Sequence, residues 1–168
     1  MGVLDGNPKN EPMHYGEIFT IWESSMGAKM ILSCYQAFTY HAGDKELKEL
    51  LGDLIDQAKL EIKEFDKLLS EAGITPPPML PERPEAKLED IPAGARFADP
   101  EIGAKLAMDN AAGLAGCSSA MGMSIREDIA ALFAKYHVAK TGFGLRILRL
   151  NKEKGWLVPP PLLVKKPE

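Results

Sequence analysis

The sequence predicts an all-α fold, a four-helix bundle made of two similar helical hairpins. Four segments carry apolar residues at the three- and four-residue spacing of one helix face. They cover about 13–42, 45–72, 100–122 and 124–154. Glycine ends the second and the fourth segment, where a left-handed cap favours it, and a proline-rich connection separates the two pairs. These three observations together predict paired helices rather than a sheet.

The first helix is expected from about Met13 to Ala42. Its predicted core-facing stripe is Ile18, Phe19, Trp22, Met26, Met30, Cys34, Ala37, Phe38 and His41. The second helix is expected from about Lys45 to Ala72, with Gly43 closing the first helix and Asp44 capping the second. Its apolar stripe lies opposite a face rich in lysine and acid, so it is the most clearly amphipathic segment.

Residues 74–98 hold six prolines and are predicted to be a connection. In polyproline geometry they would reach roughly 75 Å, at about 3.1 Å per residue. A helix covering 45–72 is only about 42 Å long. The connection can therefore run the whole length of a bundle. One such crossover is the topology of ferritin-like bundles, and it predicts that the first and third helices are antiparallel.

The third helix is expected from Pro100 to Gly122 with Asp99 as its cap, and its many alanines and glycines let a neighbouring helix approach closely. Ser124 followed by Glu127 fits a capping box that starts the fourth helix, which runs to about Lys154. Beyond it, the apolar and proline-rich tail is expected to pack along the bundle surface.

The two hairpins close with similar runs, Gly73 to Pro78 and Gly155 to Pro161, and each run contains three consecutive prolines. A shift of 82 residues aligns Phe65 with Ile147. We interpret this as an internal duplication. The predicted organisation is one domain, 1–168. It comprises a hairpin at 13–73, a crossover at 74–98, a second hairpin at 99–155 and a tail at 156–168.

Composition and charge exclude several classes of partner. The 168-residue chain carries a net charge of −4, which argues against nucleic-acid binding and against a basic membrane-surface helix. No apolar run approaches a membrane span, and Met1 to Glu11 lacks the features of a secretory signal. An intracellular location is therefore expected. Cys34 and Cys117 are expected to be reduced thiols toward opposite ends of the bundle.

The run from Lys152 to Pro161, with its Gly-Trp-Leu-Val-Pro-Pro-Pro close, resembles a family of unknown function from spore-forming Bacillus-type bacteria. The opening His14 to Ile18 and Trp22 fit the same family. Some members are labelled as spore coat proteins. The resemblance spans nearly the whole chain and implies a ferritin-like fold, no defined activity, and a cytoplasmic or spore-associated location.

A conventional di-iron site is not expected. Ferritin-like di-iron proteins use a Glu from each of two helices and a Glu-x-x-His from each of the other two. The first helix has no acid between Glu23 and Asp44, and the fourth has none between Asp128 and Glu153. No metal-ligand set and no catalytic residue is predicted, and the sequence indicates no particular cofactor.

A reduced site at the bundle centre stays possible, because Glu61, Asp109, Asn110 and His137 fall near the middle of their helices. The candidate ligand-binding residues are Glu61, Asn110 and His137. The alternative is that Asn110 and His137 are buried polar groups satisfied by their neighbours. Glu61 and Glu64 border the lysine face of the second helix and are expected to face solvent.

Three functions are compatible with these features. The favoured one is a non-catalytic structural or interaction bundle connected with sporulation. A homodimer or a protein partner would then dock on the Ala/Gly-rich third helix or on the proline-rich segments. The second is a ferritin-like protein with a divergent metal or small-ligand site in the bundle centre. The third is an enzyme acting through Cys117, which would need a base supplied by the fold.

Overall fold

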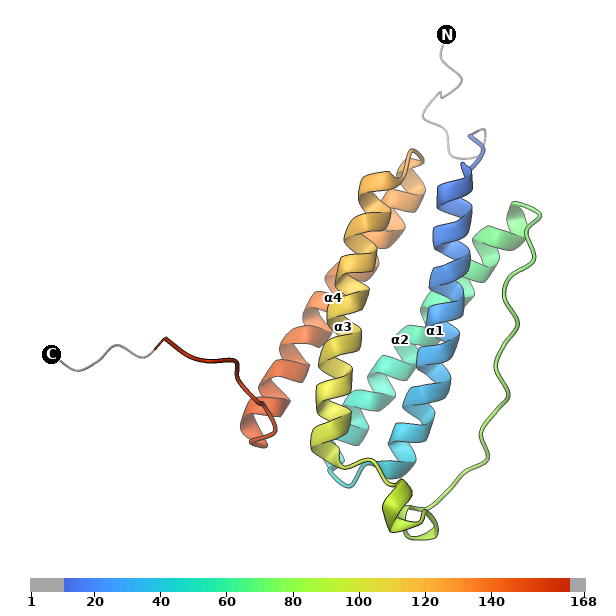
Figure 1. Cartoon of the computed structure of the whole chain (residues 1–168). Helices are drawn as coiled ribbons and strands as arrows, with labels where there is room; N and C mark the ends of the chain where they lie inside the picture. Colours follow the sequence, from blue (N-terminus) through green and yellow to red (C-terminus); the bar gives the residue numbers. More distant parts are fainter. Residues whose placement is uncertain (1–10, 164–168) are drawn as a thin grey trace, which may run out of the picture.

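The computed structural model describes residues 11–163, and four long helices form a bundle within them (Figure 1). The helices are α1 (Tyr15–His41), α2 (Lys45–Glu71), α3 (Asp99–Met123) and α4 (Glu127–Glu153). Two short 3-10 turns, Leu88–Asp90 and Ala93–Ala95, lie in the crossover, and the described residues contain no strand. The all-α four-helix prediction is confirmed. No helix in this part of the chain is long and apolar enough to span a membrane.

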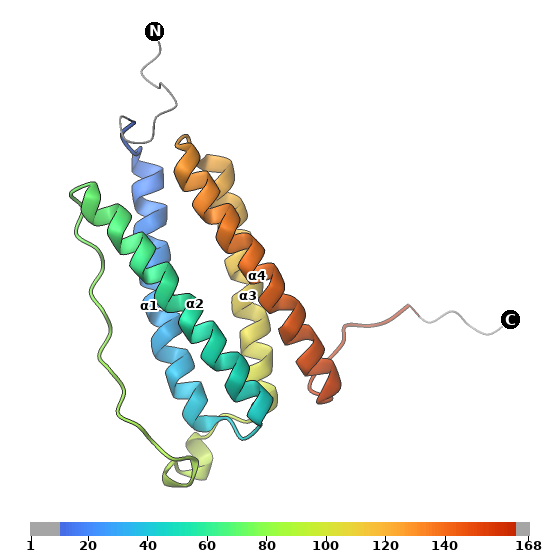
Figure 2. The ribbon, with the colours of Figure 1, turned by 180° about the vertical axis from the view of Figure 1, so that it is seen from behind.

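The crossover between α2 and α3 runs the length of the bundle on the outer side of α1 (Figures 1 and 2). It returns the chain to the end at which α2 began, so that α1 and α3 are antiparallel. At one end the Nε2 atom of His14 lies 3.1 Å from the carbonyl oxygen of Met123. At the other end the backbone N–H of Phe97 donates to Nδ1 of His41, also over 3.1 Å. The predicted ferritin-like topology is confirmed.

The core consists of two large apolar clusters at the two ends of the bundle and a smaller one between them. The first surrounds the α1–α2 loop and includes Tyr35, Phe38, Leu51, Leu106 and Ile147. The second lies at the opposite end, where the ring of Phe65 contacts those of Phe133 and Tyr136. Burial of such side chains is the main source of stability in a bundle of this size.

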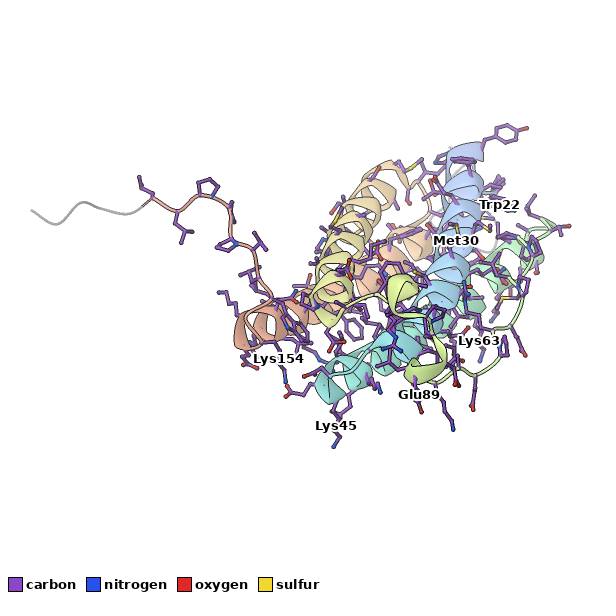
Figure 3. The ribbon with its side chains drawn as sticks, turned by 60° about the horizontal axis from the view of Figure 1, so that its bottom comes forward. Trp22, Met30, Lys45, Lys63, Glu89 and Lys154 are labelled. Carbon is purple, nitrogen blue, oxygen red and sulfur yellow. The ribbon has the colours of Figure 1, made fainter. Side chains whose placement is uncertain are left out.

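The predicted core face of α1 is wrong, because of the nine residues of the predicted stripe only Phe38 is buried and the core-facing side is nearly opposite. Phe19 and Met30 are exposed, Met30 to 56%, and Figure 3 shows Trp22 and Met30 on the outside of α1. The buried residues are Glu17, Ile21, Ser25, Ala28, Lys29, Leu32, Tyr35 and Phe38. Apolar residues occur on both sides of this helix, so their spacing alone does not identify the core-facing side.

The crossover is fastened to the first hairpin by a buried lysine. Lys29 is only 1% exposed, and its ammonium donates to the backbone oxygen of Pro77 over 2.5 Å and to both carboxylate oxygens of Asp66. Ser25 donates to the same carboxylate. Further along, Arg83 donates to the backbone oxygen of Ser33 (2.9 Å). These polar anchors hold the proline-rich segment against α1, since proline itself offers no N–H for the purpose.

The predicted glycine caps Gly73 and Gly155 are confirmed, with φ of +74° and +70°, whereas Gly43 does not cap α1, whose C-cap residue is Ala42 in an extended conformation. Asp44 caps α2 as predicted, accepting from the backbone N–H of Leu47. The predicted caps of the other hairpin are wrong. Asp99 is the first residue of α3 rather than its cap, and Ser124 ends α3 by donating to the Ala120 oxygen instead of capping α4.

The loop between α3 and α4 is held instead by a glutamate of the other hairpin. Glu17, in the first turn of α1, has a fully buried side chain. Its Oε1 accepts the backbone N–H groups of Ile125 and Arg126, both over 2.9 Å. Its Oε2 accepts the N–H of His14, whose imidazole caps α1. One carboxylate therefore satisfies three backbone donors at helix ends.

Asp99 performs the corresponding task at the opposite end of the bundle. Its two carboxylate oxygens accept the N–H groups of Gly43 (2.8 Å) and Asp44 (2.9 Å), in the α1–α2 loop. A shift of 82 residues carries the Glu17 contacts onto these, and it also carries the bounds of α2 onto those of α4. The internal duplication is thus a property of the contacts as well as of the sequence.

The prediction that the tail packs along the bundle surface is wrong for residues 157–163. Trp156 packs against the first core cluster. Beyond it the chain leaves the end of α4 and projects away from the helices (Figures 1 and 2). Val158 is 88% exposed, and Leu162 and Leu163 are exposed as well. The prolines keep the segment extended, and residues 164–168 lie outside the described part.

Candidate functional site

The centre of the bundle contains a cavity of about 60 Å³ to which all four helices contribute side chains. Its walls are mostly aliphatic and aromatic. The polar groups that line it are Tyr35, Gln57, Glu61, Asp109, Asn110 and Lys140. A cavity of this size and polarity can hold a few water molecules or a small ligand.

The dominant feature of the cavity is an ion pair between α2 and α4. The Lys140 ammonium donates to Oε1 of Glu61 over 2.5 Å, and the same oxygen accepts from Nε2 of Gln57. The side chains of Glu61 and Lys140 are only 9% and 19% exposed. A buried carboxylate needs such a partner, because an unpaired charge is strongly disfavoured away from water.

Two glycines make room for these polar side chains. A Cβ atom added at Gly113 on α3 would lie 3.0 Å from the Cδ and Cε atoms of Lys140. A Cβ atom added at Gly144 on α4 would lie 2.6 Å from the Asn110 amide nitrogen. The small residues of α3, which the sequence associates with close helix packing, here also let Lys140 cross the bundle centre.

Two tyrosine hydroxyls extend the polar network on either side of the central pair. Tyr35 donates to Asp109 over 3.2 Å, and burial together with the Asp109 carboxylate raises the pKa of Tyr35. Tyr136 donates to Glu64, and burial together with that carboxylate raises the pKa of Tyr136. Both hydroxyls therefore remain protonated donors at neutral pH.

The structure brings together two of the three candidate ligand-binding residues. Glu61 and Asn110 line the cavity, whereas His137 is half-buried on α4 and is not among the lining residues. The expectation of solvent exposure is wrong for Glu61, which is buried, whereas Glu64 is partly exposed and accepts from Tyr136. The reason is Lys140, which crosses from α4 and draws Glu61 inward.

Lys140 is the central residue that sequence reasoning did not select as a site residue. The sequence does indicate that Lys140 is buried, because this residue falls within the apolar stripe of the fourth helix, between Tyr136 and Phe143. A charged residue in such a stripe indicates a buried partner. The partner itself, Glu61, lies on a different hairpin and follows from the fold alone.

The polar groups of the cavity do not fit the di-iron centre found in many ferritin-like proteins. Such a centre needs four glutamates and two histidines directed inward. Among residues 11–163 no cluster of three or more histidine, cysteine, aspartate or glutamate side chains is placed to hold a metal ion. The cation that faces Glu61 is the Lys140 ammonium.

The two cysteines are free thiols, Cys34 half-buried and Cys117 buried in the second core cluster. Burial raises the pKa of both thiols. A raised pKa lowers the fraction of thiolate, which is the nucleophilic form. The environment of Cys117 is thus opposite to that of an activated catalytic cysteine.

We predict that both cysteines of the folded protein react slowly with iodoacetamide at about pH 8. The cause is the shortage of thiolate combined with steric shielding. In urea both thiols are expected to react at the rate of a free cysteine, and the measurement is mass spectrometry of quenched time points. A Cys117 that reacts faster in the folded state than in urea would restore the hypothesis of a catalytic thiol.

The fold and its central polar pair define residues 11–163 as a ferritin-like four-helix bundle in which the di-iron ligand set is absent. The chain belongs to the protein family of unknown function DUF3231, whose family model matches residues 1–168. It is 50% identical over 166 residues to the uncharacterized protein YvdQ of Bacillus subtilis, covering 99% of this chain and 98% of that one.

Solved structures agree with this placement. The crystal structure of a protein from Bacillus halodurans, described as a "putative spore coat protein", has a TM-score of 0.93 and 46% identity, covering 95% of this chain and all of the other. A two-domain protein of Anabaena variabilis, with a DJ-1/ThiJ/PfpI-like and a ferritin-like domain, has a TM-score of 0.64 at 16% identity. It covers 95% of this chain and 43% of its own, and it supports the fold alone.

Proposed function

We propose that the protein is a non-catalytic structural or interaction module that acts in sporulation. The observation that carries this proposal is the buried ion pair at the bundle centre. Where a di-iron bundle gathers carboxylates and histidines, this chain places the buried Lys140–Glu61 pair, which joins the two hairpins. This pair links α2 to α4. The Glu61 carboxylate is bound to the ammonium and is therefore not available as a general base.

The proposed place of action is the coat of the forming spore. The support is the Bacillus halodurans relative, described as a putative spore coat protein. The outer surface also suits an interaction role. Apolar side chains stand exposed on α1, α3, α4 and the tail, including Phe19, Met108, Val138 and Leu163. These side chains are accessible to another protein, and a binding surface would be a contiguous patch of them.

The test is to express the chain, fused to a fluorescent protein, in sporulating Bacillus subtilis that lacks YvdQ. We expect the fluorescence to follow the developing spore and to be present on intact mature spores. Chemical removal of the coat should transfer the fusion protein from the spores to the coat extract. The unfused fluorescent protein is the control. Fluorescence that stays diffuse in the mother cell throughout sporulation and is lost with it would overturn the proposal.

A second candidate function is a small-ligand site in the bundle centre, favoured by the cavity between Glu61, Asn110 and Lys140. A second cavity of about 140 Å³ shares Glu61 and Lys140 and extends toward Cys117. A ligand here would be small, with an apolar body and polar groups for the lysine and the amide. Native mass spectrometry of protein purified without a tag tests this, and a bare protein mass with no adduct would count against it.

A further inference from the structure

The internal duplication predicts a binding surface, here called a seat, for each of the two proline-rich segments, the crossover after α2 and the tail after α4. In the first half, the segment after α2 lies against α1, where Pro77 is buried and its oxygen accepts from Lys29. Lys29 and Ser25 also bind Asp66, so the floor of this first seat is polar. Leu80 then lines a groove beside Ser33 and Cys34 of α1.

The equivalent surface of the second hairpin is uncovered and apolar. A shift of 82 residues replaces the three polar residues of the first seat by Ala107, Ala111 and Leu148. All three are exposed, Leu148 to 40%. The same shift replaces Ser33 by Ala115, which is exposed too. We call the surface of Ala107, Ala111, Ala115 and Leu148 the second seat.

The segment that corresponds to the crossover in the second half is the tail. The shift carries Pro77 onto Pro159 and Leu80 onto Leu162. The hydrogen bond from Ile74 N–H to the Leu69 oxygen recurs as Trp156 N–H to the Asn151 oxygen. The two segments therefore leave their helices in the same way. Only the crossover is pulled back along its hairpin, because it must continue into α3.

The tail does not occupy the second seat of its own chain. The N–H of Leu157 makes a further bond to the Asn151 oxygen, and the chain then runs outward, beginning beside Lys154 (Figure 3). The prolines at 159–161 keep this outward course, since polyproline geometry is stiff over several residues. One molecule thus carries both an apolar arm and an uncovered apolar seat that matches it.

We propose that the tail of one copy docks in the second seat of another copy. Two molecules related by a two-fold axis exchange their tails reciprocally, which closes the assembly as a dimer. The exposed alanines leave room for the prolines, and Leu162 covers the part of α3 near Ala115. This inference names a partner for the proposed interaction role and rests on that role. It does not depend on where in the cell the protein acts.

The test is a disulfide crosslink in the full chain with both natural cysteines replaced, Cys34→Ser and Cys117→Ala. Two single-cysteine proteins are prepared in this background, Leu162→Cys and Ala115→Cys, mixed and oxidised. We expect a disulfide-linked heterodimer on non-reducing gels, sensitive to reductant. The matched control replaces Ala115→Cys by Lys48→Cys, on the exposed face of α2, where no heterodimer is expected.

The double variant, with both cysteines in one chain, separates exchange from self-docking. An intrachain disulfide, seen as a monomer without free thiols, would overturn the exchange, and so would thiols that remain free. Light scattering after size exclusion gives a second readout that needs no cysteine. The full chain is expected to be a dimer, and a chain ending at Leu157, which keeps Trp156 in the core, is expected to be a monomer. An unchanged mass on truncation would also overturn the proposal.

Discussion

Replacing Glu17 by alanine is expected to lower the free energy of unfolding by about 3–5 kcal/mol. The carboxylate is fully buried and accepts three backbone N–H groups, one at the start of α1 and two at the start of α4. Each donor left unpaired in a buried site costs about 1–3 kcal/mol, and the three losses are not fully additive. Urea unfolding followed by circular dichroism measures the change.

Asp99→Ala is the matched control, because Asp99 binds the corresponding loop of the other hairpin. The Gly43 end of this contact is exposed, so water replaces the lost acceptor there. We expect a loss of about 1–2 kcal/mol. Glu17→Gln keeps an acceptor oxygen and should fall between the wild type and Glu17→Ala. A larger loss for Asp99→Ala than for Glu17→Ala would contradict the assignment of Glu17 as the principal clamp.

The sequence predicts the helices and their connection because these depend on local signals. The bounds of α2 differ by one residue from those expected, since its charged face leaves only one side for the core. Gly73 and Gly155 identify their helix ends because glycine, which has no Cβ atom, adopts the left-handed conformation at the lowest energetic cost. The crossover follows from proline content and reach. Each of these features is decided within a few residues of the chain.

The errors occur where a partner distant in sequence decides the outcome. Lys29 is buried because Asp66 and the Pro77 oxygen, on two other segments, satisfy its ammonium. Asp99 is drawn away from capping its own helix by the N–H groups of Gly43 and Asp44. An isolated sequence segment does not contain these partners, and short-range rules therefore assign such residues to solvent or to a local cap.

The candidate site divides in the same way. The mid-helix position of Glu61 correctly predicts that it lines the bundle centre. The neighbouring lysines of α2 wrongly predict that it is exposed to solvent. Burial of Glu61 depends on Lys140, which reaches it from the second hairpin past Gly113. The duplication does not predict this pair, because the equivalent of Glu61 after a shift of 82 residues is Phe143. The two halves share helix bounds and end contacts, but their side chains at the bundle centre differ.

Lys140→Met is expected to destabilise the protein by about 3–5 kcal/mol, because it leaves the Glu61 carboxylate buried without its cation. The double variant Lys140→Met, Glu61→Leu removes both charges and should recover most of that loss, since replacing a buried pair by apolar residues is often close to neutral. Urea unfolding of the two single variants and the double variant yields the coupling energy.

An exposed ion pair of the same helix offers a matched control for the buried pair. Lys59→Met is this control, because Lys59 pairs with Asp56 on the exposed face of α2 and its loss should change stability little. Equal losses for Lys140→Met and Lys59→Met would show that the central pair does not join the two hairpins. If it does join them, the duplicated halves hold together through charge at the centre as well as through the Glu17 and Asp99 clamps at the two ends.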